Sequence, residues 1–70
     1  MKKDETLFRG EEVEILVNHH GRVNPKFFQK AGIITGVNKK NRLPYTVMVI
    51  GVGADDFKET ELRRINPLKS

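Results

Sequence analysis

The residues with the most suggestive chemistry are basic and lie in the middle of the chain. From Ile15 to Ala54 the sequence has no Asp or Glu but has six Lys and Arg residues. The flanking segments hold all nine acids and seven bases, so the middle carries +6 and the flanks −2 of the net charge of +4. Such a positive field attracts phosphate groups or acidic surfaces. The six residues are Arg22, Lys26, Lys30, Lys39, Lys40 and Arg42.

Aromatic residues accompany these bases. Phe27 and Phe28 lie among the first three, and Tyr45 follows the last three. An aromatic ring beside a basic groove can stack on a nucleic-acid base. If the two basic segments meet at one rim of the fold, the pattern predicts contact with a nucleic-acid backbone. Two alternatives stay open, namely a groove for an acidic protein partner and a solvated face that binds nothing.

Nucleophilic catalysis has little to draw on in this sequence. The chain has no cysteine, and its only serine is Ser70, at the C-terminus, so serine and cysteine triads lack a nucleophile. The carboxylate pairs Asp55-Asp56 and Glu59/Glu61 fall in a turn and a short 3₁₀ segment, where solvated surface acids are the ordinary case. We therefore expect no enzymatic activity and no small-molecule substrate.

Metal and cofactor sites are not expected either. His19 and His20 offer two imidazoles, but a metal site needs three or four ligands, and no acid lies near them in sequence. Gly51-Val52-Gly53 resembles a phosphate loop only superficially, because no helix follows it, and a tight turn is the better interpretation. The sequence predicts no metal site and no cofactor.

Chain length indicates one small domain. Seventy residues form a single unit, with an expected ordered core over about residues 7–66 and frayed termini. Without cysteine there is no disulfide, so stability must come from apolar packing and a closed sheet. No stretch approaches the roughly 18 apolar residues of a membrane span, and no signal peptide is evident. The expectation is a cytoplasmic protein without membrane contact.

A β-hairpin organises the chain. Two β-branched runs, residues 33–37 and 45–52, flank the polar segment 38–44, as strands flank a turn. Gly32 and Gly36 inside the first run predict a bulge or sharp bend. Residues 45–50 are apolar on both faces except for Thr46, which predicts a central strand covered on both sides.

Short strands and loops complete the sequence. Residues 12–17 alternate, with Val13, Ile15 and Val17 on one face, which predicts a half-buried strand. The segment 18–30 is a long loop, in which Asn24-Pro25 argues against a helix and one of the two adjacent Phe residues is expected to enter the core. A turn is expected at 51–55, a strand at 56–58, a single 3₁₀ turn at 58–62 and a last strand at 63–65. The fold prediction is all-β, a small five-stranded SH3-like barrel with a long first loop and a 3₁₀ turn before the last strand.

Several segments resemble known SH3-like proteins. Residues 9–16, 32–37, 44–49, 56–57 and 61–62 resemble the electron-transport accessory proteins, most nearly the small photosystem I reaction-centre subunit. Residues 30–34 are similar to the lysine-x-glycine core of a KOW segment of ribosomal and transcription proteins. The chain departs from the photosystem subunit at His19 and His20, where that family typically has aromatic residues, and the photosynthetic function is not carried over.

The whole sequence is also similar to the YorP family of prophage-encoded bacterial proteins, which have no assigned role. This resemblance implies an SH3-like barrel and brings no activity with it. Two hypotheses follow. The first is a non-catalytic module that binds nucleic-acid backbone through the six basic residues. The alternative, suggested by the accessory-protein resemblance, is a protein-interaction adaptor that docks through the same rim, with Phe27 or Phe28 as an aromatic anchor.

Overall fold

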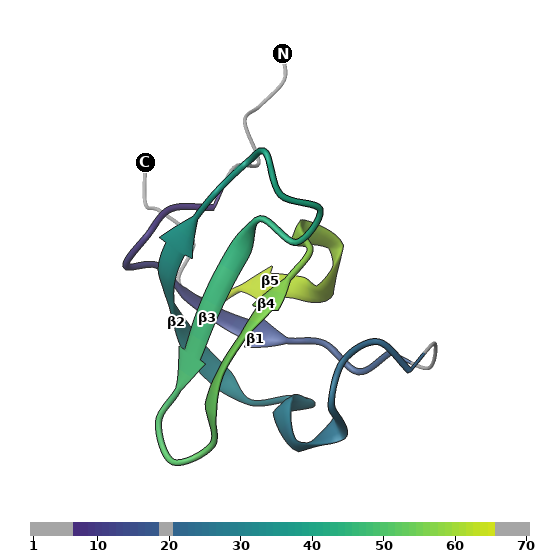
Figure 1. Ribbon diagram of the computed structural model, residues 1–70. Helices are drawn as coiled ribbons and strands as arrows, with labels where there is room; N and C mark the ends of the chain where they lie inside the picture. The colour runs from purple at the N-terminus through teal and green to yellow at the C-terminus, as the bar shows by residue number, and fades with distance from the viewer. Residues whose placement is uncertain (1–6, 19–20, 66–70) are drawn as a thin grey trace.

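A single antiparallel sheet of five strands forms the body of the protein (Figure 1). The computed structural model describes residues 7–18 and 21–65. The strand order is β4-β3-β2-β1-β5, and two 3₁₀ turns, η1 and η2, precede β2 and β5. The elements are β1 (Glu12–Ile15), η1 (Pro25–Phe27), β2 (Ala31–Val37), β3 (Tyr45–Val49), β4 (Gly53–Phe57), η2 (Glu59–Glu61) and β5 (Leu62–Arg64).

This architecture confirms the predicted fold class. The strands are short, the first loop is long, and η2 directly precedes the last strand. Figure 1 shows β3 and β4 crossing in front of β1 and β5, so the sheet curls around its contents as a small barrel does. The pairings between described residues join neighbours in the strand order, with β4 and β5 at its two ends.

The β2–β3 hairpin contains the predicted bulge. Ile34 pairs with Val47 and Gly36 with Thr46, so the register shifts between Ile34 and Gly36. Gly32 has a different role. A Cβ atom at Gly32 would lie 2.6 Å from Cγ1 of Val47, so only glycine lets the two strands approach this closely.

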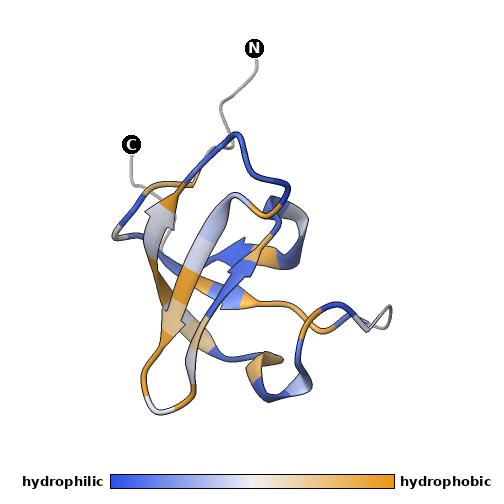
Figure 2. Ribbon diagram, viewed as in Figure 1, coloured by the Kyte–Doolittle hydropathy of each residue, from blue (hydrophilic) through white to orange (hydrophobic). Residues whose placement is uncertain are grey.

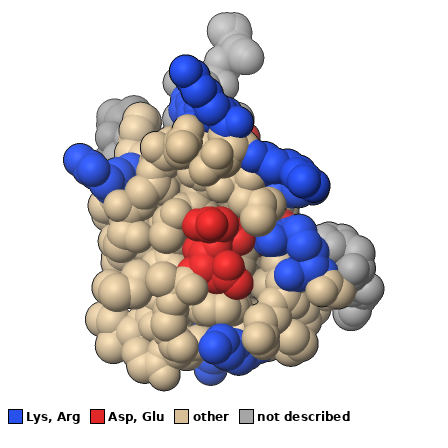
Figure 3. Space-filling model, in the orientation of Figure 1, with Lys and Arg blue, Asp and Glu red and all other residues tan. Residues whose placement is uncertain are grey.

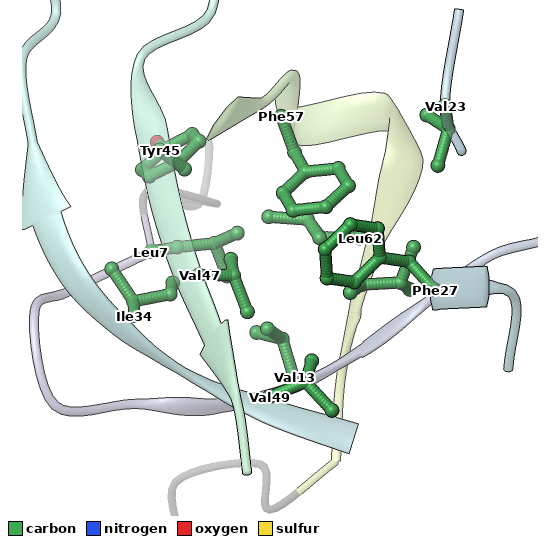
Figure 4. Packing of buried hydrophobic residues seen from close by; sticks show 11 residues of the cluster. Leu7, Val13, Val23, Phe27, Ile34, Tyr45, Val47, Val49, Phe57 and Leu62 are labelled. Carbon is green, nitrogen blue, oxygen red and sulfur yellow. The ribbon is translucent and has the colours of Figure 1, made fainter. Parts of the chain in front are cut away.

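Inward-facing side chains from all five strands fill the core (Figure 4). Phe27 of η1 packs edge-to-face on Phe57 of β4, with ring centroids 5.6 Å apart and an interplanar angle of 83°. The long first loop is therefore anchored in the core by Phe27, while Phe28 is only partly buried, as expected for adjacent residues. The buried apolar residues are Leu7, Val13, Ile15, Val23, Phe27, Ile34, Tyr45, Val47, Val49, Phe57 and Leu62.

The first strand is shorter than predicted. β1 ends at Ile15, and Val17, expected on the inner face, is 42% exposed. The backbone N–H of Leu16 donates to the carbonyl of Glu61 at 2.9 Å, and the chain then leaves the sheet. The alternation in the sequence continues beyond the point where β1 loses its partner strand, so the prediction for Val17 was wrong.

The expectation that the central strand is covered on both faces was also wrong. Val47 and Val49 point into the core, but Met48 is 41% exposed and Ile50, just beyond the strand, is 87% exposed. Within the described part of the chain, these two side chains therefore remain accessible on the outer face. Figure 2 shows the resulting apolar colouring along β3 and the turn after it.

The following turn and strand differ from the prediction in their bounds. The turn covers residues 50–52, where Gly51 has φ 85°, and β4 already begins at Gly53. β4 pairs with β3 from Val49↔Gly53 to Tyr45↔Phe57. The turn is shorter than predicted, so five residues of β4 pair with β3 where the prediction allowed three. Asp55 and Asp56 are accommodated because β4 is an edge strand that faces solvent.

Both 3₁₀ turns have local causes. η1 was not predicted, because Asn24-Pro25 was taken to exclude a helix; instead the side chain of Asn24 accepts from the Lys26 N–H at 3.0 Å and Pro25 occupies the first position of the turn. η2 lies within the predicted segment, and β5 starts one residue earlier than expected, at Leu62. Among the described residues, neither turn nor any other helix has the length and apolarity needed to cross a membrane.

Candidate functional site

The connection between β2 and β3, residues 38–44, is held in a defined shape. The backbone N–H of Asn38 donates to the carbonyl of Pro44 at 2.7 Å and closes the base of the loop. Inside it, the N–H of Lys40 donates to Oδ1 of Asn38 at 3.1 Å, and the N–H of Asn41 to the Asn38 carbonyl at 3.0 Å. Because these bonds fix the backbone, the basic side chains of the loop project from a preorganised support.

A groove of about 480 Å³ lies on one side of this connection. We call it the arginine groove. Three segments far apart in sequence build it, namely the first loop, the connection, and the end of β4 with the residue that follows. It is lined by Arg22, Asn41, Arg42, Leu43, Asp56 and Lys58.

Arg22 is fixed in this groove by a buried acid. Its Nε donates to Oε2 of Glu61 at 2.8 Å, its Nη2 donates to Oε1 of the same carboxylate, and Nη2 also reaches the Asp56 carbonyl at 3.3 Å. The guanidinium carbon lies 6.0 Å from the centroid of the Phe57 ring. Glu61 is 4% exposed, so this contact ties the long first loop to η2.

The electrostatics of the pair follow from these contacts. Burial on its own would raise the pKa of Glu61, but hydrogen bonds from Arg22 and from the Lys58 N–H, together with both positive charges, lower that pKa below its ordinary value. The hydrogen bond to Glu61 raises the pKa of Arg22, and the charges of Asp55 and Asp56 add to this. Arg22 is thus a permanently charged but largely neutralised wall of the groove.

A second groove, of about 400 Å³, lies on the other side of the connection. We call it the phenylalanine groove, because Phe8, which is 51% exposed, lines it. Leu7 and Val37 supply apolar lining, and Arg9 and Lys39 supply two cations. The connection thus separates two basic grooves, one beginning at Lys39 and the other at Asn41.

The six predicted basic residues do not all converge. Arg22 and Arg42 share the arginine groove, and Lys39 and Lys40 belong to the same connection. Lys26 and Lys30 lie with η1, which Figure 1 places at the opposite end of the molecule from the connection. The Nζ of Lys26 there lies 5.4 Å from the centroid of the Phe27 ring. Four of the six are therefore brought together and two are not.

The predicted aromatic contacts fare differently from one another. Phe27 and Tyr45 are 2% and 3% exposed and belong to the core, so neither offers a ring face to a ligand. Phe28 is partly buried. Sequence reasoning missed Phe8, whose signal was its place beside Arg9 near the start of the chain, and Lys58, which is hidden in an acid-rich flank.

Two acidic side chains lie close to these cations, since Glu61 pairs with Arg22 and Asp56 lines the arginine groove. Glu11 pairs with Arg64 and Glu14 with Arg63. These ion pairs link β5 to the residue before β1 and to β1 itself. Asp55 and Asp56 stand exposed on β4, and Figure 3 shows an acidic patch in the middle of this face with basic side chains around it in separate places. Because of this acidic patch, the positive surface lies at the rim around the β2–β3 connection and not on the face of the sheet.

Other predicted features give no site. His19 and His20 lie outside the described residues. Within residues 7–18 and 21–65, no three His, Asp or Glu side chains are grouped so that they could hold a metal ion. Comparison of the chain with protein-family models, with curated proteins and with solved structures gave no match.

Proposed function

We propose that this protein is a non-catalytic binding module that contacts nucleic-acid phosphates along the β2–β3 connection. The observation that carries the proposal is that cations from four separate segments flank this one preorganised loop. We call them together the basic crest, comprising Arg9, Arg22, Lys39, Lys40, Arg42 and Lys58. A cytoplasmic location is part of the proposal.

Ion pairing inside the protein supports this choice. Arg22, Arg63 and Arg64 are each occupied by a glutamate. Lys40 and Arg42, in contrast, are exposed and have no acidic partner among the described residues. A phosphate group can therefore approach these two cations without displacing an internal carboxylate, and release of its counterions favours binding.

The acidic patch on β4 restricts the path of the ligand. Phosphates are repelled by Asp55 and Asp56, so the sheet face between the two ends of the molecule is unfavourable for a polyanion. Binding then follows the rim, is salt-sensitive, and depends little on sequence because phosphate contacts carry no base information.

Two variants of equal charge change test the proposal. Lys40→Glu/Arg42→Glu reverses two crest cations, while Lys26→Glu/Lys30→Glu reverses two exposed cations near η1. Both bring the net charge from +4 to zero, so their overall charge is equal and the position of the lost charge differs. Fluorescence anisotropy with a labelled oligonucleotide of about 12 nucleotides, at two salt concentrations, measures the affinity.

We expect the crest variant to lose binding and the η1 variant to retain it. If the crest variant loses two phosphate contacts, any remaining binding should also depend less on salt. The slope of log K against log salt concentration should become smaller in magnitude by about 1.4 for single strands. Equal weakening of both variants would show that only net charge matters and would contradict the crest. No binding by the wild type at low salt would end the nucleic-acid proposal altogether.

An adaptor function is the second candidate, favoured by the outer face of the sheet. Ile33, Met48 and Ile50 are exposed there around a shallow groove of about 220 Å³. Ile33 pairs with Met48 across β2 and β3, so the two side chains are neighbours on that face. An apolar strip of this kind suits a protein partner with an apolar anchor.

A comparison of two variants in a pull-down separates the two candidate functions. For an adaptor, retention of a partner protein should be lost in Met48→Lys and unchanged in Lys40→Glu/Arg42→Glu. The opposite pattern, or retention that ignores both variants, would remove the outer strip from consideration.

A further inference from the structure

The phenylalanine groove has the components that an unpaired nucleotide requires. The exposed aromatic residue Phe8 lines it together with the apolar residues Leu7 and Val37. Arg9 and Lys39 provide positive charge at the same groove. A nucleobase stacks on an aromatic face, and its own phosphate requires a cation nearby.

Backbone hydrogen bonds hold Phe8 in position. Its N–H donates to Oε1 of Glu11 at 2.9 Å, and its carbonyl accepts from the Glu11 N–H at 3.0 Å. The turn is fixed onto β2, because the Gly10 N–H donates to the Ile34 carbonyl and the Ile34 N–H to the Glu11 carbonyl. The carboxylate of Glu11 is paired with Arg64, so the groove is not dominated by its negative charge.

We propose that the phenylalanine groove binds an unpaired base of single-stranded nucleic acid, whose backbone then crosses the β2–β3 connection into the arginine groove. This inference rests on the proposed function and specifies its ligand. The Phe8 ring is the stacking platform, and Arg9 and Lys39 contact the adjoining phosphate.

Single strands fit this surface better than duplexes. A base within a duplex is covered on both faces by its neighbours, so Phe8 gains no stacking partner unless a base is unstacked at a cost of a few kcal/mol. An unpaired base presents its face freely. Because every base has such a face, the site tolerates any sequence.

The two grooves define a path for the backbone of the nucleic-acid strand. They adjoin the same connection, with Lys39 in one, Arg42 in the other and Lys40 between them in sequence. A backbone that passes over the connection meets these cations in turn. The acids of β4 limit this path on one side, because Asp56 also lines the arginine groove.

A tryptophan reporter tests the inference directly. The chain has no tryptophan, so Phe8→Trp introduces a single tryptophan, which can be excited selectively, at the proposed stacking position. Ile50→Trp is the matched control, because Ile50 is 87% exposed and lies at the far end of β3 from the connection. Each variant is titrated with a single-stranded oligonucleotide of about 12 nucleotides and with the duplex of the same sequence.

We expect a saturable loss of emission for Phe8→Trp with the single strand, weaker loss with the duplex, and no change for Ile50→Trp. In anisotropy, Phe8→Leu should bind the single strand at least about fivefold more weakly than the wild type, since stacking contributes about 1–3 kcal/mol per base. Phe8→Tyr, which keeps the ring, should retain the affinity.

The outcomes distinguish this inference from the proposed function. Salt-sensitive binding that Phe8→Leu leaves unchanged, with no quenching at position 8, would overturn the stacking site and leave the phosphate-binding crest intact. A duplex bound as tightly as the single strand by the wild type would overturn the single-strand preference. Absence of binding by the wild type would overturn both.

Discussion

At the scale of single residues, Glu61 links fold and site. It is the one acidic side chain of the core region that is buried, at 4% exposure, among the described residues. It accepts both from Arg22 and from the Lys58 N–H, so its charge is compensated on two sides. Loss of one partner would leave a buried ion that is only partly compensated, which is unfavourable.

The lowered pKa of Glu61 predicts acid sensitivity. A carboxylate with a folded-state pKa below its ordinary value of 4.5 stabilises the fold above that pH, and the contribution is lost as the pH falls through the lowered pKa. We expect Glu61→Gln to reduce the free energy of unfolding by about 1.5–3 kcal/mol at neutral pH. Urea denaturation at several pH values measures this.

The pH profile provides the control for this prediction. As the pH falls from 4.5 through the lowered folded-state pKa, the difference between wild type and Glu61→Gln should shrink, since the carboxyl becomes protonated first in the unfolded chain and then in the folded protein. Glu59→Gln, an exposed change in the same turn, should follow the wild type throughout. A constant difference at all pH values would show that Glu61 acts through packing and not through its charge.

At the scale of elements, the β2–β3 hairpin depends on the close approach at Gly32. A Cβ there would meet Cγ1 of Val47 at 2.6 Å and the Met48 carbonyl oxygen at 2.7 Å. At Gly36 a Cβ would find only Thr46, at 3.6 Å, which is ordinary contact. The two glycines of β2 are therefore required for different reasons. Gly32 allows the close approach of β3, and Gly36 lies at the bulge.

Alanine substitutions should separate these two glycines. We expect Gly32→Ala to reduce the free energy of unfolding by about 1–3 kcal/mol, as overpacking does. Gly36→Ala should cost less than about 1 kcal/mol, because the added methyl has room. Thermal unfolding followed by circular dichroism compares them, and equal destabilisation would contradict the argument from close approach.

The same hairpin sets the spacing of the two grooves. β2 ends at Val37 beside the phenylalanine groove, and β3 begins at Tyr45 next to the arginine groove. Because the hydrogen bonds of Asn38 close the loop between them, its cations are positioned before any ligand arrives. Preorganisation of this kind lowers the entropy cost of binding.

At the scale of the whole molecule, charge is divided between internal pairs and the rim. Three arginines neutralise Glu11, Glu14 and Glu61, while the cations at the connection face solvent. A ligand that binds this rim in the folded state stabilises the entire domain through mass action, since the unfolded chain has no assembled crest.

We therefore expect a single-stranded oligonucleotide at about 100 times its dissociation constant to stabilise the fold by about 2.7 kcal/mol. For a domain of this size that corresponds to a Tm increase of roughly 10–20 °C. Lys40→Glu/Arg42→Glu should show no such increase, and Lys26→Glu/Lys30→Glu should show most of it. A thermal melt with and without the oligonucleotide makes the comparison, and an increase of equal size in both variants would count against the crest.

Much of the fold was readable in the sequence because short-range patterns specify it. Alternation around Val13 and Ile15, β-branched runs on both sides of residues 38–44, and Gly36 at the bulge predicted strands, hairpin and irregularity that the structure confirms. The predictions were wrong where the burial of a residue depends on which other segment packs against it. Val17 continues the alternation but lies beyond the end of β1, and Met48 is apolar but stays 41% exposed.

The sequence by itself determined an all-β domain with a basic middle, because strand propensity, turn chemistry and charge are local properties. Only the tertiary structure decided which cations meet, since Arg22 of the first loop reaches the groove that Lys58 also lines through its bonds to Glu61 and to the Asp56 carbonyl. It also decided which aromatic ring is exposed, burying Phe27 and Tyr45 and leaving Phe8 at the surface. Burial depends on what packs against a residue from a distant part of the chain, and no local pattern contains that information.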